Sequence, residues 1–276
     1  MTRLIHLSDL HYGRDDPELE TPLLDTIAEL DPDLVVISGD FTQRARRSQF
    51  ARARAFLDRI AAPTLSVPGN HDTPLDNLFL RFLRPFHRYK RAIDRQLEPV
   101  HEGDGIIVAG VNTVNRFAWQ RGRMSRHTTA RVCRVFDEVP DKVQIAVLHH
   151  PLEHGPEVDK RLMKGARAAL QSLAECGTDV VLSGHLHEAR AQPFSTAPGL
   201  LFVQAGTGLS TRLRGEPNTF NLLDIDGSRI AVTTYSNALE TANSPAFRAT
   251  GTAVFERAPS GWDRVAETVG PTRAAQ

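Results

Sequence analysis

The residues most suited to chemistry in this sequence are the two histidines of Gly184–His187, which reads Gly-His-Leu-His. This stretch directly follows Val180–Ser183, a short, apolar, β-branched segment that predicts a buried strand ending in a glycine turn. Residues two apart do not share a face of a helix, whereas on an extended turn they can reach neighbouring points on one side of the chain. We therefore interpret the pair as ligands that reach two adjacent metal ions.

Four further blocks place carboxylate, amide or imidazole side chains directly after predicted strands. They are Asp9-Leu10-His11, Gly39-Asp40, Gly69-Asn70-His71-Asp72 and His149-His150-Pro151. Imidazole and carboxylate ligands suit Zn, Mn and Fe, and the thiolates typical of a structural zinc site are missing from these blocks. Two ions that share a bridging carboxylate can clamp a phosphate and lower the pKa of the water between them, so that hydroxide attacks phosphorus near neutral pH.

The order of the five blocks, DxH…GD…GNHD…H…GHxH, resembles the calcineurin-like metallophosphoesterases over about residues 4–190. The resemblance implies that the first ion is held by Asp9, His11 and His187. It implies that the second ion is held by Asn70, His149 and His185, and that the Asp40 carboxylate bridges the two ions. His149 is preferred to His150 because the family's ligand lies two residues before the proline. For His150, a ligand role and a place behind the ligands both stay open.

The resemblance and the spacing also indicate catalytic and substrate-binding residues. His71 follows a ligand without being one, so we interpret it as the general acid that protonates the departing oxygen, with Asp72 as its orienting partner. The neutral amide of Asn70 should hold the second ion less tightly than a carboxylate would. The predicted substrate-binding residues are Asn70, His71, Asn112 and Arg212, and Arg214 lies in the same loop as Arg212.

The elements that must position these blocks alternate between strands and helices. Strands are predicted at Arg3–Leu7, Leu34–Ile37 and Thr64–Val67, with one helix opening at Thr21 and another over about 44–60. This alternation indicates a parallel sheet, and such sheets place their sites beyond the carboxyl ends of the strands. The later strands are predicted at Ile106–Val111, Val143–Leu148, Val180–Leu182, Leu200–Gln204, Phe220–Ile225, Arg229–Tyr235 and Thr252–Arg257, with helices capped at Thr128 and over about 160–175.

The fold class expected from this order and from the resemblance is α/β. The resemblance implies a four-layer α/β/β/α metallophosphoesterase sandwich with two central mixed sheets, the second contributed largely by the C-terminal strands. We expect one domain over residues 1–265, a helical cap segment at about 74–104 and a disordered tail over 266–276. The basic stretch Arg81–Arg95 is expected to be a solvated face, and Trp119 a packed loop anchor.

Composition excludes some classes of function. The 276 residues include 33 basic and 33 acidic ones, and this zero net charge argues against a general nucleic-acid binder. No window approaches the roughly 20 apolar residues of a membrane span. Cys133 and Cys176 form no CxxC pair, so we expect reduced packing thiols in a cytoplasmic protein. The expected partner is a small phosphodiester, with neither nucleic acid nor membrane; a homo-oligomer stays open.

The leading hypothesis is a binuclear metal-dependent phosphodiesterase that hydrolyses a small organic phosphodiester, with cyclic nucleotides among the candidates. Its cofactors would be two divalent ions of Mn, Fe or Zn. The alternative is a phosphomonoesterase or a nucleotide-linked metabolite pyrophosphatase on the same core, because substrate choice depends on capping segments rather than on the metal blocks. A scaffold that has lost its metals and a nuclease with a basic groove are two further hypotheses.

Overall fold

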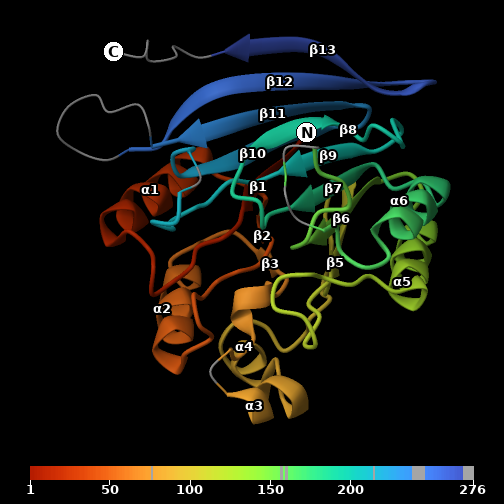
Figure 1. Cartoon of the computed structure of the whole chain (residues 1–276). Coiled ribbons are helices and arrows are strands. Elements are labelled where there is room, and N and C mark those ends of the chain that lie inside the picture. Colours follow the sequence, from red (N-terminus) through yellow and green to blue (C-terminus); the bar gives the residue numbers. More distant parts are fainter. Residues whose placement is uncertain (76, 156–157, 159–160, 214, 238–245, 270–276) are drawn as a thin grey trace.

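Two mixed β-sheets lie face to face in the computed structural model, and helices cover both outer faces (Figure 1). The structure describes all residues except 76, 156–157, 159–160, 214, 238–245 and 270–276. The first sheet has the order β13-β12-β11-β10-β1-β2-β3 and the second the order β4-β5-β6-β7-β9-β8. The first contains β1 (Thr2–Leu7), β2 (Leu34–Ile37), β3 (Thr64–Ser66), β10 (Thr219–Asp226), β11 (Arg229–Ser236), β12 (Arg248–Ala258) and β13 (Gly261–Val269). The second contains β4 (Val100–Glu102), β5 (Ile106–Val111), β6 (Val143–Leu148), β7 (Val180–Ser183), β8 (Arg190–Pro193) and β9 (Leu201–Gln204).

Alternation along each buried strand divides the core into three layers. In β2, Leu34 and Val36 pack between the two sheets, whereas Val35 and Ile37 face the helices α1 (Glu20–Leu30) and α2 (Arg47–Leu57). On the other side, α5 (Arg126–Asp137) and α6 (Ala166–Glu175) cover the second sheet. Successive strand residues point to opposite faces, so wholly apolar strands serve both faces at once. The expected α/β/β/α sandwich is confirmed.

The expected origin of the second sheet is wrong. β10 pairs antiparallel with β1, and β11 to β13 continue outward from β10, so the C-terminal strands extend the sheet that the N-terminus begins. The predicted tail is also too long, because Ala266 pairs with Val254 inside β13. Trp262 anchors that strand with 2% of its surface exposed. The rest of the predicted tail, 270–276, lies outside the described residues.

Two expected helix starts are corrected by the contacts at the helix ends. α5 begins after Ser125, whose hydroxyl accepts from the amide of Thr128, so Thr128 lies inside the helix. α1 begins at Glu20, behind a 3-10 turn (Pro17–Leu19) capped by Asp16, and Thr21 lies within it. The cap segment contains two short helices, α3 (Leu78–Leu83) and α4 (His87–Ala92), and then β4.

A disulfide joins Cys133 on α5 to Cys176 at the end of α6, which makes the expectation of reduced thiols wrong. The two residues are 43 positions apart, and the side-by-side packing of the two helices brings them together. Sequence spacing alone did not indicate the pairing, because neither cysteine belongs to a recognisable motif. Within the described residues, no helix is both long enough and apolar enough to cross a bilayer.

Removal of this disulfide is expected to destabilise the chain. Closing a loop of 43 residues restricts the unfolded state, and loops of this length correspond to about 3–4 kcal/mol. A Cys133→Ala, Cys176→Ala double variant should therefore unfold at a clearly lower guanidinium concentration than the oxidised parent, and the reduced parent should match the variant. Thiol titration of the denatured parent should find no free thiol; two free thiols, or identical midpoints, would contradict the assignment.

Candidate metal centre

The expected ligands occupy strained turns at the carboxyl ends of five strands. Five of the seven have left-handed backbone, with φ of 54° at Asp9, 50° at His11, 54° at Asp40, 72° at His185 and 65° at His187. Non-glycine residues avoid this region, and clusters of such residues are typical of functional sites. The neighbouring glycines allow the turns to approach closely, because a side chain at Gly184 would collide with Ser8 and Asp9, and one at Gly69 with Asp40.

The first group of ligands contains Asp9, His11 and His187, all buried. Asp9 Oδ1 lies 3.3 Å from His11 Nε2 and 3.1 Å from His187 Nε2, and the two nitrogens are 3.4 Å apart. Ligands about 2.1 Å from a common ion at angles near 100° would be separated by about 3.2 Å. The spacing therefore fits three ligands of one cation.

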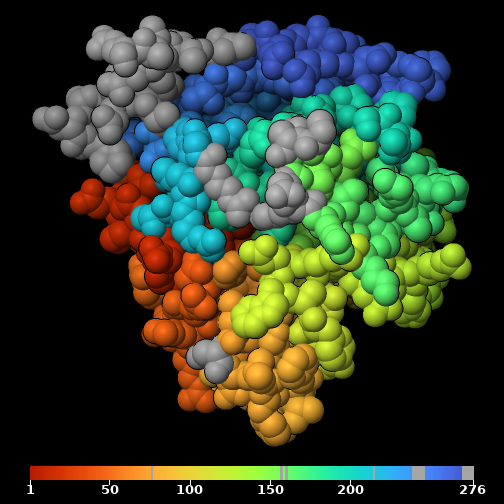
Figure 2. All heavy atoms as spheres, in the orientation of Figure 1, coloured from red at the N-terminus to blue at the C-terminus, as the bar shows by residue number. Residues whose placement is uncertain are grey.

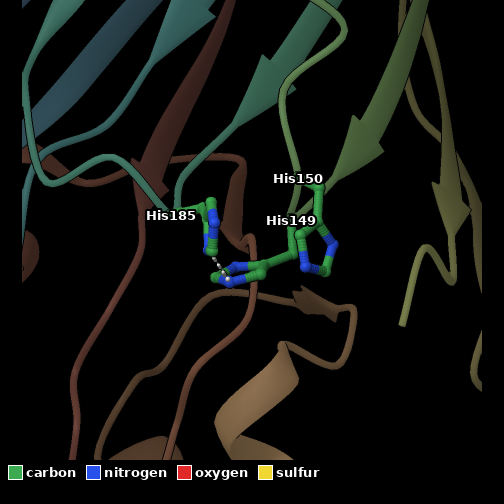
Figure 3. A group of neighbouring side chains, drawn as sticks. All are labelled: His149, His150 and His185. Atoms are coloured by element: carbon green, nitrogen blue, oxygen red, sulfur yellow. Dashed lines mark hydrogen bonds between the residues drawn. The ribbon is translucent and has the colours of Figure 1, made fainter. Parts of the chain in front are cut away.

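The second group contains Asn70, His149 and His185. His149 Nε2 lies 3.2 Å from Asn70 Oδ1 and 3.3 Å from His185 Nδ1. Figure 3 shows the rings of His149 and His185 pointing toward one another, with His150 beside them. Asp40 Oδ2 is 3.3 Å from His149 Nε2 and 3.7 Å from His11 Nε2, so a single carboxylate oxygen lies between the two groups.

The protons on the outer ring nitrogens show why this arrangement fits a cation. His149 Nδ1 donates to the Ser38 carbonyl at 2.8 Å, and His187 Nδ1 donates to the Arg212 carbonyl at 3.0 Å. In the neutral rings, the lone pairs on Nε2 then face carboxylate oxygens, which is repulsive unless a cation lies between them. Asp9 Oδ1 is buried and accepts no hydrogen bond within the described residues. These donors fit divalent ions bound by nitrogen and oxygen.

The electrostatics of the isolated chain indicate the same need for positive charge. Burial alone would raise the pKa of Asp9, but the imidazoles of His187 and His11 outweigh it and hold that pKa well below its usual range. Burial alone would lower the pKa of His149, but the Asp40 carboxylate reverses this and raises it to about 9. The buried Asp40 carboxylate thus favours a compensating positive charge, which a proton on the His149 ring supplies in the isolated chain.

His71 lies at the edge of both groups, with its ring held away from the ligand positions. Its Nδ1 donates to the Gln43 carbonyl at 2.9 Å, its backbone amide donates to Asp40 Oδ1 at 2.8 Å, and its ring packs edge-on against that of His11. Burial lowers the pKa of His71 more than the Asp40 charge raises it. The other ring nitrogen, Nε2, is not bound to the backbone and faces Arg212 Nη1 at 3.5 Å.

The expectation that Asp72 orients His71 does not fit the contacts. The Asp72 carboxylate accepts from the amides of Phe41, Thr42 and Gly69 at 3.2, 2.9 and 2.9 Å. Burial and the Asp40 charge raise its pKa to about 7 despite these donors. Asp72 therefore fixes the turns that carry Asp40 and Asn70, and Gln43 orients His71 instead.

The predicted substrate residues separate into two groups. Arg212 Nη1 lies 3.5 Å from His71 Nε2 and 3.5 Å from the Gln43 side-chain oxygen, so Arg212 belongs to the site together with Asn70 and His71. The side chain of Asn112 instead accepts from the amide of Val114 at 3.0 Å and forms a local turn. Arg214 lies outside the described residues.

Sequence reasoning missed the residues that support the ligands. Ser38 and Gln43 act through backbone carbonyls, which leave no signal in a sequence. Thr113 accepts from the backbone amide of His150 at 3.3 Å, and its hydroxyl lies 2.7 Å from His150 Nδ1. One ring nitrogen of His150 is therefore held by Thr113, and His150 also belongs with His149 and His185 to a group that could hold a metal ion.

Comparisons with known proteins show what this chain resembles. A model of the calcineurin-like phosphoesterases matches residues 2–189. The chain is 27% identical over 170 residues to the glycerophosphodiester phosphodiesterase GpdQ of Enterobacter lignolyticus (strain SCF1), covering 54% of this chain and 56% of that protein. It thus spans little more than half the length of that relative. It is 26% identical over 206 residues to a probable cyclic nucleotide phosphodiesterase of Pseudoalteromonas sp. (strain SM9913), covering 70% and 74% of the two chains.

Solved structures show the same fold. The purple acid phosphatase PPD1 of yellow lupin superimposes with a TM-score of 0.62 at 16% identity, over 89% of this chain and 53% of that one. A PhoD structure superimposes with a TM-score of 0.69 at 10% identity, over 98% and 72% of the two chains. The match over residues 2–189 contains every residue of the two ligand groups, and on that match the chain belongs to the calcineurin-like phosphoesterase family.

Proposed function

We propose that this protein is a binuclear metal-dependent phosphodiesterase that hydrolyses a small organic phosphodiester. The observation that carries the proposal is the position of Asp40 Oδ2, which lies 3.3 Å from a nitrogen of one ligand group and 3.7 Å from a nitrogen of the other. A carboxylate that serves both groups is typical of paired hydrolytic ions. The two curated relatives carry phosphodiesterase names, which supports this reaction class.

Two divalent ions of Mn, Fe or Zn would supply charge neutralisation of the phosphate and a hydroxide at neutral pH. The protein's own residues supply orientation and proton transfer. Arg212 places a guanidinium beside His71 Nε2, where it can bind a phosphate oxygen. Gln43 holds the ring so that Nε2, once protonated, faces the departing oxygen and donates to it.

A cavity of about 270 Å³ beside the second ligand group supports a small substrate. Its walls include Arg121, His150, His154, Leu162 and His185, so apolar and hydrogen-bonding surfaces meet there. Small-molecule sites usually combine an apolar wall with a few polar groups, and their volumes begin near 300 Å³. One modest ester substituent would occupy this space beside the phosphate.

A substrate panel tests the proposal. With manganese added, bis-p-nitrophenyl phosphate and cyclic AMP should be hydrolysed faster than p-nitrophenyl phosphate, and the metal content should approach two ions per chain. A chelated sample measured in parallel should lose activity and regain it with manganese. Much faster hydrolysis of p-nitrophenyl phosphate than of either diester would show that the protein is a phosphomonoesterase instead. A chain that binds no metal and shows no activity would support a scaffold.

A further inference from the structure

The cap segment ends in an exposed apolar surface that the proposed hydrolysis does not use. Ten large apolar side chains are exposed in the described part of the chain, and six of them gather on α3 and the loop beside it. We name this group the apolar tip; it contains Leu78, Phe79, Phe82, Leu83, Phe117 and Trp119. Trp119 is 62% exposed, so the expectation that it is a packed loop anchor is wrong. Large contiguous apolar surfaces mark interaction sites.

The apolar tip is a built surface rather than a frayed loop. Arg81 is 3% exposed, against the expected solvated face, and its guanidinium donates to the carbonyls of Arg116 and Ala118 and to the hydroxyl of Thr73. These bonds fasten α3 to the loop that carries Phe117 and Trp119. The Phe82 and Phe117 rings stack with centroids 5.7 Å apart. A buried arginine thus holds the exposed aromatic side chains in fixed positions.

Basic side chains accompany the apolar tip: Arg84 directly follows Leu83, and Arg116 bonds to the carbonyl of Phe82. Residues 77–93 contain five lysines and arginines and no aspartate or glutamate, although the whole chain carries no net charge. Arg84, Lys90, Arg91 and Arg116 are exposed there. Such a surface favours a partner that is anionic and also accepts apolar side chains.

The shape and charge of the apolar tip favour one of three candidate partners, which are a second copy of the chain, a nucleic acid and a lipid bilayer. α3 forms a protruding end of the molecule rather than a groove (Figures 1 and 2). A symmetric contact between two copies would place the same basic residues opposite one another, which is repulsive. Nucleic acid offers phosphates and bases, but no apolar layer for Leu78 and Leu83. A bilayer with anionic headgroups accepts the basic rim at its surface and the apolar side chains beneath it.

We propose that the apolar tip docks this protein on anionic lipid surfaces, which replaces the expectation of no membrane partner. Leu78, Phe79, Leu83 and Trp119 enter the boundary between headgroups and acyl chains. The exposed lysine and arginines contact lipid phosphates. The site requires no catalysis, so its test is independent of the proposed hydrolysis.

The two tryptophans make the test direct, because Trp119 is 62% exposed whereas Trp262 is 2% exposed. Vesicles of phosphatidylcholine with 30% phosphatidylglycerol should shift the emission of the full-length protein to shorter wavelength. Vesicles of phosphatidylcholine alone should do so much less. The change should disappear in Trp119→Phe, and co-sedimentation should report binding without fluorescence.

Variants identify the surface responsible. Phe79→Ser with Leu83→Ser should weaken partitioning into anionic vesicles at least tenfold, and Arg84→Glu with Arg91→Glu should abolish the preference for anionic lipid. Val100→Ser with Val265→Ser removes exposed apolar side chains elsewhere, 43% and 49% exposed against 71% and 63% for Phe79 and Leu83, and should change partitioning less than twofold.

Three outcomes would overturn the proposal. The first is an absence of vesicle binding at low salt. The second is vesicle binding that the Phe79 and Leu83 variant leaves unchanged. The third is a dimer, or a complex with single-stranded DNA, that this variant abolishes in a protein that ignores vesicles.

Discussion

Asp40→Ala is expected to bind neither metal ion stably and to lose activity by about 10³-fold or more. The carboxylate lies within 3.7 Å of nitrogens from both ligand groups, so its removal weakens both ion sites together. Paired ions contribute several kcal/mol of transition-state stabilisation, and each 1.36 kcal/mol corresponds to a tenfold change in rate. Elemental analysis of the purified variant and hydrolysis of bis-p-nitrophenyl phosphate would measure the two losses.

Two control variants separate the loss of ligands from the loss of folding. Asp179→Ala removes another buried aspartate, whose carboxylate accepts from the amide of Gln144. Asp179 directly precedes β7, so it lies at the opposite end of that strand from His185. This control should keep its metal even if it melts earlier. Asp40→Asn keeps the shape of the side chain and an acceptor for the amide of His71. An Asp40→Ala protein that retained two ions and near-normal activity would refute the bridging role.

His71→Ala should keep its metal and slow the hydrolysis of substrates with poor leaving groups by about 10²–10⁴-fold. General acids contribute in this range, and an alkoxide needs the proton far more than a nitrophenolate does. The ring is held by Gln43 and packs edge-on against His11, whereas the contacts within each ligand group are made without it. Parallel rates on an alkyl phosphodiester and on bis-p-nitrophenyl phosphate give the comparison.

Gln43 and His101 provide further variants for this experiment. Gln43 holds His71 through its backbone carbonyl, so Gln43→Ala should leave that hydrogen bond in place and lose only the weaker contacts of its side chain, with Arg212 at 3.5 Å and with His71 Nδ1 at 3.4 Å. His101 pairs with Val108 in the edge strand β4 and serves as a histidine control. Equal slowing of good and poor leaving groups in His71→Ala would show that His71 positions the substrate rather than protonates it.

The sequence predicted that these side chains would lie close together, because each chemically loaded block directly follows a buried strand. Parallel strands bring their carboxyl ends to one edge, so Asp9, Asp40 and Asn70 had to lie near one another once the strand order was known. The wholly apolar β2 likewise predicted a strand covered on both faces, which the structure confirms.

The wrong predictions concern residues whose partners or burial are determined by contacts between distant parts of the chain. The sequence indicated Asp72 as a partner of the adjacent His71, but its carboxylate instead accepts hydrogen bonds from the backbone amides of Phe41 and Thr42, which are 31 and 30 residues away. The partner of Cys133 lies 43 residues away on a different helix. Arg81 has the sequence character of a solvated residue, but its bonds to the loop at 116–118 and to Thr73 hold it in a buried position. Such pairings depend on the fold and leave no local pattern.

The left-handed backbone at the ligand turns lowers the stability of the folded chain at the same positions that metal binding requires. Each such residue costs about 1–2 kcal/mol relative to ordinary backbone, and five ligand positions have this conformation, namely Asp9, His11, Asp40, His185 and His187. Glycine at one of these turns would relax the metal-free chain while removing a ligand. Variants selected only for heat resistance should therefore tend to lose metal binding. When selection for activity is relaxed, substitutions should accumulate first at these turns.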